Sequence, residues 1–385
     1  MTEKKLPVKK TAIIHDWLFS YSGSERVIES LTNLWPDADI FTLFNFLSDE
    51  EQKIVLKNKV PKTSFIQDLP FAKKSYRKYL PLFPYAIEQF DVTKYDLVIS
   101  SSHAVAKGII TSPGQLHICY CHTPIRYAWD LTFQYLRESG LNKGLMGTLT
   151  KSILHYIRSW DVSSANRVDY FIANSNYISK RIRKIYRRDS VVIYPPVDTS
   201  RFTCSEKKED YYLTASRFVP YKKIDLIVET FSKMPDKKLI VIGSGPDEKK
   251  IRSFAGPNIE FAGYKKPDEM KIIMQKAKAF VFAAEEDFGI VPIEALSCGT
   301  PVIALNKGGT AETITDSVTG IHFNEQTVES LMQAVKRFES IQNSFDPKAL
   351  SGYAKQFDRS VFEDKIKSFI REKSDLFFGE IKDQL

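Results

Sequence analysis

Short apolar runs that resemble buried strands alternate along this chain with longer segments of helical periodicity, and this alternation restricts the possible folds more than any other feature. The strand-like runs of the first half are residues 10–17, 96–102, 116–122, 169–175 and 190–196. Between the first two, residues 23–35 repeat apolar side chains every three or four positions, which indicates a helix. Strands that alternate with helices predict a parallel sheet covered on both faces.

The same pattern restarts in the second half. Its strand-like runs are residues 211–217, 237–245, 258–264, 277–284 and 300–305. A chain of 385 residues exceeds the size of one hydrophobic core, and Tyr194-Pro195-Pro196 stiffens a connection between the two series. We therefore expect an α/β protein with two Rossmann-like, doubly wound domains at 1–200 and 201–360, followed by a helical tail at 361–385 that braces them. Ligands bind at the carboxyl ends of such strands, so the site is expected in a cleft between two facing sheets.

The composition limits the partners. A formal charge of +8 and a pI near 9.0 favour anionic partners: nucleotides, nucleic acid or an anionic membrane surface. The sequence shows no recognisable nucleic-acid-binding module, no apolar run near the roughly 18 residues of a membrane span and no secretory signal, which favours a cytoplasmic protein. The four cysteines are too few for a disulfide framework and are expected to be reduced and buried.

The stretch EEDFGIVPIEALSCG contains four acidic residues, and two of them, Glu286 and Glu294, flank one loop and one helix N-terminus. Glu286 is expected at the end of a strand, and Glu294 in the first turn of a short helix that starts near Pro292. The backbone amides around Ile290 and Val291 suit an anion such as a diphosphate. Each glutamate also has an ordinary structural interpretation, as a helix-capping residue or as a solvated acid at a strand end.

Cations and glycines that follow strands are candidates for binding phosphate. Arg217 and Lys222, in SRFVPYKK, are predicted to converge on one anion, although a solvated surface turn is an alternative. Gly23, Gly243 and Gly245 follow strands and permit close approach of the backbone to phosphate. Neither glycine motif is a complete G-x-G-x-x-G or P-loop sequence, which disfavours NAD-dependent enzymes and P-loop NTPases.

The segment CYCHTPIRYAWD suits sugar recognition. His122 follows a strand, although His15 and His103 have similar placements and a lone histidine is often structural. The neighbouring side chains that could contact a sugar are Arg126, Tyr127 and Trp129.

Two basic stretches occur in the first half, FAKKSYRKYLPLFPY (71–85) and YISKRIRKIYRR (177–188). In the second, Ile178, Ile182 and Ile185 share one helical face and cations occupy the rest. A basic helix with an apolar face can lie on an anionic membrane, so we expect one or both stretches to do so. Packing of the second helix on its own domain is the alternative.

Taken together, SGSERV, CHTPIRYAWD, SRFVPYKK, VIGSGP, EFAGY and EEDFGIVPIEALSCGTPVIA resemble glycosyltransferase family 4, whose members are retaining enzymes of the GT-B fold that use nucleotide sugars. The likeness spans residues 10–360, and its most specific element is the E-x7-E pair of Glu286 and Glu294. The segments IIHDW, YDLVISSSHAVAKG and YCHTPIRYAWDL look like the mannosyltransferases that build O-antigen and other bacterial surface polysaccharides.

The resemblance implies a role for each matching residue. Glu286 and the backbone of Phe288, Gly289 and Ile290 would hold the donor sugar, and Glu294 the ribose. His122 would contact the transferring sugar, and His122 and Glu286 are the catalytic candidates. The other donor-side residues implied are Gly23, Arg217, Lys222, Gly243, Gly245, Gly263, Tyr264 and Val291, and those implied for the acceptor side are Arg126, Tyr127 and Trp129. Sugar-binding carboxylates and phosphate-binding cations are expected to lie apart. Ser22 replaces the first glycine of the family's Gly-Gly pair, which puts only the flexibility of that loop in question.

The resemblance also implies the reaction: transfer of mannose from GDP-mannose, with retention and without a metal or other cofactor, to a polyprenyl-diphosphate-linked saccharide at the inner face of the cell membrane. A UDP-sugar donor, an epimerase or hydrolase of the same architecture, and a non-enzymatic nucleic-acid binder are the alternatives. Asp37-Ala38-Asp39 has the D-x-D form of a metal site, although it also suits a turn.

Overall fold

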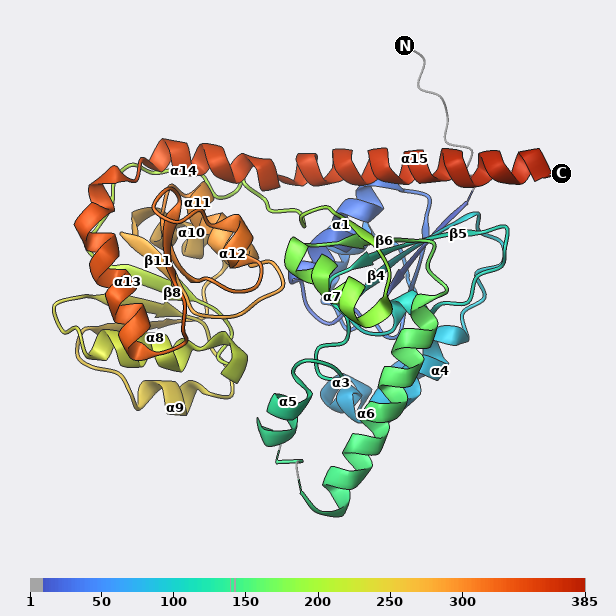
Figure 1. The fold of residues 1–385 in the computed structure, drawn as a ribbon, viewed down its shortest axis with the longest axis horizontal. Coiled ribbons are helices and arrows are strands. Elements are labelled where there is room, and N and C mark those ends of the chain that lie inside the picture. Colours follow the sequence, from blue (N-terminus) through green and yellow to red (C-terminus); the bar gives the residue numbers. More distant parts are fainter. Residues whose placement is uncertain (1–9, 139, 142, 385) are drawn as a thin grey trace, which may run out of the picture. The chain divides into compact units, whose positions relative to one another are not determined.

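The computed structural model describes residues 10–138, 140–141 and 143–384. The chain divides into two compact units (Figure 1): the first ends at Pro196 and resumes at Phe362, and the second spans Val197–Val361. Each unit is a parallel sheet flanked by helices, so the predicted fold class is confirmed. The residues of the expected separate tail, from Phe362 onward, belong to the first unit, and their bracing role stays a prediction.

The first unit holds a sheet in the order β3-β2-β1-β4-β5-β6-β7, and every pairing among its described strands is parallel. Its strands are β1 (Thr11–His15), β2 (Asp39–Thr42), β3 (Lys62–Thr63), β4 (Leu97–Ser102), β5 (Leu116–Cys121), β6 (Tyr170–Ala173) and β7 (Ser190–Val192). Its helices are α1 (Gly23–Leu34), α2 (Asp49–Leu56), α3 (Ala72–Ser75), α4 (Phe83–Glu88), α5 (Thr132–Glu138), α6 (Gly144–Ala165), α7 (Asn176–Tyr186) and most of α15 (Arg359–Gln384), with 3-10 turns η1 (Phe65–Asp68), η2 (Tyr76–Leu82) and η3 (Ala106–Gly108).

The two faces of this sheet bury different helices. Ile13 and Ile99 point to the face covered by α1 and by α15, whose residues Phe362 and Ile366 are at most 2% exposed. Ile14, the next residue along β1, points to the other face, where α4 packs. The alternation of side chains along each strand explains how one apolar run serves two cores.

The second unit holds a sheet in the order β10-β9-β8-β11-β12-β13. Its strands are β8 (Tyr212–Ala215), β9 (Leu239–Ile242), β10 (Ile259–Gly263), β11 (Ala279–Phe282), β12 (Val302–Leu305) and β13 (Gly320–Phe323). Its helices are α8 (Ile224–Ser232), α9 (Glu248–Arg252), α10 (Pro267–Lys276), α11 (Ile290–Ser297), α12 (Thr310–Thr313), α13 (Val328–Ile341) and α14 (Pro347–Ala354), with 3-10 turns η4 (Pro220–Lys222), η5 (Gln342–Ser344) and η6 (Lys355–Phe357). Helix α8 packs on α13, and α11 packs on α14.

The structure corrects the expectation for the second basic stretch. In α7 the apolar face, with Ile178 and Ile182, is buried against β5 and β6 of its own sheet. Arg181 is also buried, and it donates hydrogen bonds to the hydroxyl of Thr123 and the carboxylate of Asp130. The apolar face of α7 is therefore not available to a membrane.

The cysteines follow the expectation closely. All four are free, and three of them are buried; Cys204 is half-buried. Burial raises the pKa of Cys298 to about 12, which keeps that thiol protonated and unreactive at neutral pH.

A buried ion pair links η3 to α6. The ammonium of Lys107, 1% exposed, lies 2.6 Å from the carboxylate of Asp161 and 2.9 Å from the hydroxyl of Ser164. The same carboxylate accepts hydrogen bonds from the indole N–H of Trp129 and the hydroxyl of Tyr186. Because Lys107 and Asp161 are both buried, removal of one charge leaves the other without compensation.

We expect Lys107→Met to lower the free energy of unfolding by about 3–5 kcal/mol, since Asp161 would remain charged and buried. Lys107→Met combined with Asp161→Asn should lose less, because the amide keeps an acceptor without the charge. Urea unfolding of both variants tests this, and a single variant as stable as wild type would contradict it.

Candidate functional site

The predicted donor residues of the second unit gather where its strand order reverses. Strands β8 and β11 are neighbours, although β9 and β10 come between them in the sequence. Arg217 and Lys222 follow β8, and Glu286 follows β11. The carboxyl ends of two strands that flank such a reversal open into a crevice, the usual ligand site of doubly wound sheets.

Lys222 and Glu286 form an ion pair across this reversal, with side chains 19% and 17% exposed. The expectation that the carboxylates and the cations lie apart is therefore wrong for this pair. The pair forms because the strand order brings the loops after β8 and β11 together. Arg217 is exposed on the same loop as Lys222.

The loop after β11 ends at the N-terminus of α11. Gly289 caps this helix with φ +90°, a left-handed conformation that favours glycine, and α11 begins at Ile290, two residues before the expected start. Glu294 consequently lies in the second turn, and it is only 1% exposed. The ring of Phe288 packs edge-on against Phe357, which anchors the loop and leaves its backbone beside Glu286.

The two glycines after β9 allow their backbone to pass close to the backbone of the loop after β8. A Cβ at Gly243 would lie 1.9 Å from the carbonyl oxygen of Ser216, and a Cβ at Gly245 would lie 2.5 Å from that of Phe218. The N–H of Gly243 donates to the carbonyl of Gly263 at the end of β10, next to the exposed Tyr264. These contacts bring the loops after β8, β9 and β10 to one edge of the sheet.

Two glycines that the sequence reasoning missed, Gly308 and Gly309, complete this edge. They follow β12, and the N–H of Gly309 donates to the carbonyl of Glu286 at 2.8 Å. Gly308 has φ +70°, and a Cβ at Gly309 would lie 2.3 Å from the Cα of Phe288. The signal that could have found them is a Gly-Gly pair that begins three residues after the end of a strand-like run.

We expect Gly309→Ala to destabilise the second unit by about 1–3 kcal/mol, because the added methyl group collides with the backbone of Phe288. Gly352→Ala is the matched control: it lies in α14, its Cβ would have no atom within 4 Å, and alanine favours a helix. Thermal unfolding distinguishes the two variants, and equal stability of both would contradict the predicted collision.

In the first unit the strand order reverses between β1 and β4, and a buried carboxylate joins the two strand ends. Asp16, fully buried after β1, accepts backbone N–H bonds from His103, Ala104, Val105 and Ala106 at 2.5, 2.9, 2.5 and 2.7 Å. The ring Nδ1 of His103 lies 3.1 Å from the same carboxylate. Four aligned amides compensate a buried charge, so Asp16 fixes the loop after β4.

His122 lies beside this loop, at the end of β5. Its Nε2 is 2.8 Å from the hydroxyl of Ser101, and its ring is near those of Tyr120 and His103. Burial lowers the pKa of His122 well below its usual range, and the nearby rings of His103 and His15 lower it further. His122 is therefore neutral at pH 7 and suited to hydrogen bonding rather than to charge pairing.

We expect ring signals of ¹⁵N-histidine-labelled protein to show His122 neutral at pH 6, with His122→Gln used to assign the signal. Because the folded pKa is depressed, the unfolded chain takes up the proton first as the pH falls below 6.5, so this residue lowers stability progressively at acidic pH. A His122 signal that titrates near pH 6.5 would contradict the expectation.

Gly23 begins helix α1, and a buried glutamate that the sequence reasoning missed organises its loop. The carboxylate of Glu25 accepts hydrogen bonds from the hydroxyls of Ser22 at 2.6 Å and Ser24 at 2.9 Å, and it lies 4.0 Å from Nε2 of His15. Burial raises the pKa of Glu25, but the contacts with His15 and Ser22 outweigh it and the net shift is downward. Glu25 thus stays ionised and ties the Gly23 loop to the end of β1.

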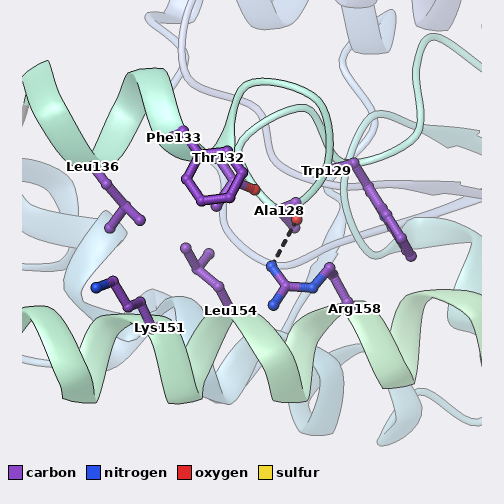
Figure 2. Close-up of a pocket in the computed structure, with 8 residues that line it drawn as sticks. All are labelled: Ala128, Trp129, Thr132, Phe133, Leu136, Lys151, Leu154 and Arg158. Carbon is purple, nitrogen blue, oxygen red and sulfur yellow. Dashed lines mark hydrogen bonds between the residues drawn. The ribbon is translucent and has the colours of Figure 1, made fainter. Parts of the chain in front are cut away.

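The three predicted acceptor-side residues occupy the loop after β5. Trp129 lines a pocket of about 400 Å³ between α5 and α6 (Figure 2), and its indole N–H is committed to Asp161. Burial raises the pKa of Tyr127, whose hydroxyl has no hydrogen-bond partner among the described residues. Arg126 is partly buried. All three lie in one loop, but the hydrogen bond to Asp161 directs Trp129 toward α6.

Asp37-Ala38-Asp39 lies at the opposite, amino-terminal edge of the first sheet. Asp39 accepts a short hydrogen bond from the hydroxyl of Tyr95 and lies 3.3 Å from the ammonium groups of Lys62 and Lys94. Tyr95 and these lysines lower the pKa of Asp39 to about 2. Within the described ranges, no group of three or more His, Cys, Asp or Glu side chains is arranged to hold a metal ion.

The comparison with known families agrees with this architecture. The model described as glycosyltransferase family 4 matches residues 21–201, and the one described as glycosyl transferases group 1 matches residues 198–357. The two matches overlap only at residues 198–201, and their boundary lies close to the boundary between the two units. The chain therefore belongs to the glycosyltransferases of family 4.

Individual relatives are distant. The chain is 28% identical over 209 residues to the uncharacterized glycosyltransferase MJ1178 of Methanocaldococcus jannaschii, covering 53% of this chain and 58% of that one. It is 25% identical over 228 residues to the O-antigen chain mannosyltransferase RfbU of Salmonella typhimurium, covering 56% and 64%. The matches thus span less than two thirds of the length of these relatives.

Among solved structures, the Anabaena protein Alr3699/HepE in complex with UDP and glucose superposes with a TM-score of 0.70 at 17% identity, covering 93% of this chain and 98% of that chain. At this identity the likeness establishes the fold, that of the two-domain GT-B glycosyltransferases.

Proposed function

We propose that the protein transfers mannose from GDP-mannose to a lipid-linked saccharide acceptor during synthesis of a surface polysaccharide. The observation that carries the proposal is the Lys222–Glu286 pair at the strand-order reversal of the second unit, beside the N-terminus of α11. The likeness to RfbU, which is named an O-antigen chain mannosyltransferase, supports mannose and this kind of product.

The donor is assigned to the second unit by chemistry. A diphosphate needs cations and free amides, and Arg217, Lys222 and the first amides of α11 supply them without a metal. A sugar needs acceptors for its hydroxyls, and Glu286 supplies them. Glu294 is assigned to the ribose. The donor would enter the ion pair, drawing Lys222 toward phosphate and leaving Glu286 for the sugar.

The reaction would proceed by displacement on one face of the sugar. A bond forms between the acceptor oxygen and the anomeric carbon while the bond from that carbon to the diphosphate breaks. The proton of the acceptor hydroxyl passes to the departing diphosphate, whose growing negative charge Arg217 and Lys222 stabilise. The roles of His122 and Gly23 toward the donor stay predictions.

We expect Glu286→Ala to reduce transfer roughly tenfold to a hundredfold, because a charge-assisted hydrogen bond contributes about 1.5–3 kcal/mol. The fold should survive, since the side chain is partly exposed. Glu229→Ala, which breaks the exposed Lys233–Glu229 pair of the same unit, is the control and should transfer at the wild-type rate. Wild-type turnover by Glu286→Ala would show that the sugar is placed wrongly.

The donor itself is tested by thermal shift in EDTA with GDP, UDP, ADP and their sugar conjugates. Stabilisation by GDP and GDP-mannose is the expected result. A response confined to UDP compounds would reassign the donor, turnover without an acceptor would favour an epimerase or hydrolase, and a response only after metal is added would contradict metal independence.

A further inference from the structure

Exposed apolar side chains gather on helices α5 and α6. Figure 1 shows that these two helices form a hairpin that projects from the sheet of the first unit. The exposed fraction is 72% for Phe133 on α5, and 91%, 61% and 54% for Leu145, Met146 and Leu149 on α6. Leu145 and Leu149 lie one turn apart, on the side of α6 opposite its buried residue Leu154. Packing within the unit therefore does not account for these exposed apolar side chains.

Two stretches beside these side chains carry cations and no acids. Residues 143–160 contain Lys143, Lys151 and Arg158 but no Asp or Glu. Residues 69–87 likewise contain no Asp or Glu, and four of their cations are exposed: Lys73, Lys74, Arg77 and Lys78. The same stretch exposes 78% of Phe71. Both stretches thus join one sign of charge with exposed apolar groups.

The two stretches meet in the structure. Leu80 of η2 packs on the small core between α5 and α6, which includes Leu136, Leu154 and Ile157. Figure 2 shows Phe133 and Leu136 of α5 facing Leu154 of α6 across the pocket. The hairpin and residues 71–85 are therefore held together as parts of one unit, and we call them the hairpin surface.

We propose that the hairpin surface docks this protein on an anionic phospholipid bilayer, with Leu145, Met146 and Leu149 inserted among the headgroups. Charge complementarity selects this partner. Protein interfaces are depleted in lysine, whereas lysines that flank apolar side chains suit an anionic lipid surface. No helix in the described parts of the chain is long and apolar enough to cross a bilayer. The inference holds whatever the donor.

The test is flotation of the whole protein with vesicles of phosphatidylcholine, alone or mixed with phosphatidylglycerol, at low and high salt. Wild type should bind the anionic vesicles, and high salt should weaken the binding by screening. An apolar variant (Leu145→Ser, Met146→Ser, Leu149→Ser) and a basic variant (Lys73→Ser, Lys74→Ser, Arg77→Ser, Lys78→Ser) should each lose roughly tenfold or more in binding.

Helix α7 offers a matched control, because Lys180, Arg183, Lys184 and Arg187 are exposed on a helix whose apolar face is buried. Replacing the first three by Ser and Arg187 by Asn removes the same charge as the basic variant and should change binding less than twofold. Asn is used at 187 because that residue has φ +57°. An equal loss in this control would show a diffuse effect of net charge and overturn the proposal.

Two other results would also overturn it. One is unchanged vesicle binding by the apolar variant. The other is a dimeric wild type that becomes monomeric in the apolar variant, which would identify the surface as an interface between copies. Thermal shift with GDP on the same variants keeps the two proposals separate: loss of vesicle binding with an intact nucleotide response bears on the membrane alone.

Discussion

In each of the two sheets the strand order reverses beside the first strand, and this reversal brings the candidate site residues together. The loops after the two flanking strands diverge to opposite faces, so side chains at their bases approach one another without a helix between them. Asp16 and the amides of residues 103–106 meet in this way in the first unit, as do Lys222 and Glu286 in the second. Residues 64 or more positions apart become direct partners because of strand order alone.

The two meeting points are built differently. Asp16 is fully buried and held by four backbone amides, which cannot move away independently, so it acts as a fixed part of the fold. Lys222 and Glu286 are partly exposed side chains with several rotatable bonds, and their pairing can exchange for other partners. One reversal therefore holds the backbone in place, while the other holds two side chains whose ion pair can separate.

The sequence was sufficient for the architecture because strands of a parallel sheet that is covered on both faces are rich in apolar residues, and ten strands were recognised as such runs. Strands β2, β3 and β13 were not assigned: β3 contains only Lys62 and Thr63, both exposed, and β13 mixes Gly and His with apolar residues. Motifs located Glu286 and Lys222. Asp16, Glu25 and Arg181 were missed as structural residues because their roles depend on burial and, for Asp16 and Arg181, on partners more than 50 positions away.

The last helix has a consequence for how this chain is made. Phe362, Ile366, Phe369 and Ile370 of α15 complete the core over α1 and the first sheet, so the sequence of the second unit is inserted within that of the first. On the ribosome, the first unit cannot bury its core until α15 has emerged, whereas the inserted second unit has emerged before that and can fold earlier. Fragments ending at Pro196 would leave that apolar face uncovered and prone to aggregate, but residues 197–361 keep all the strands of their own sheet.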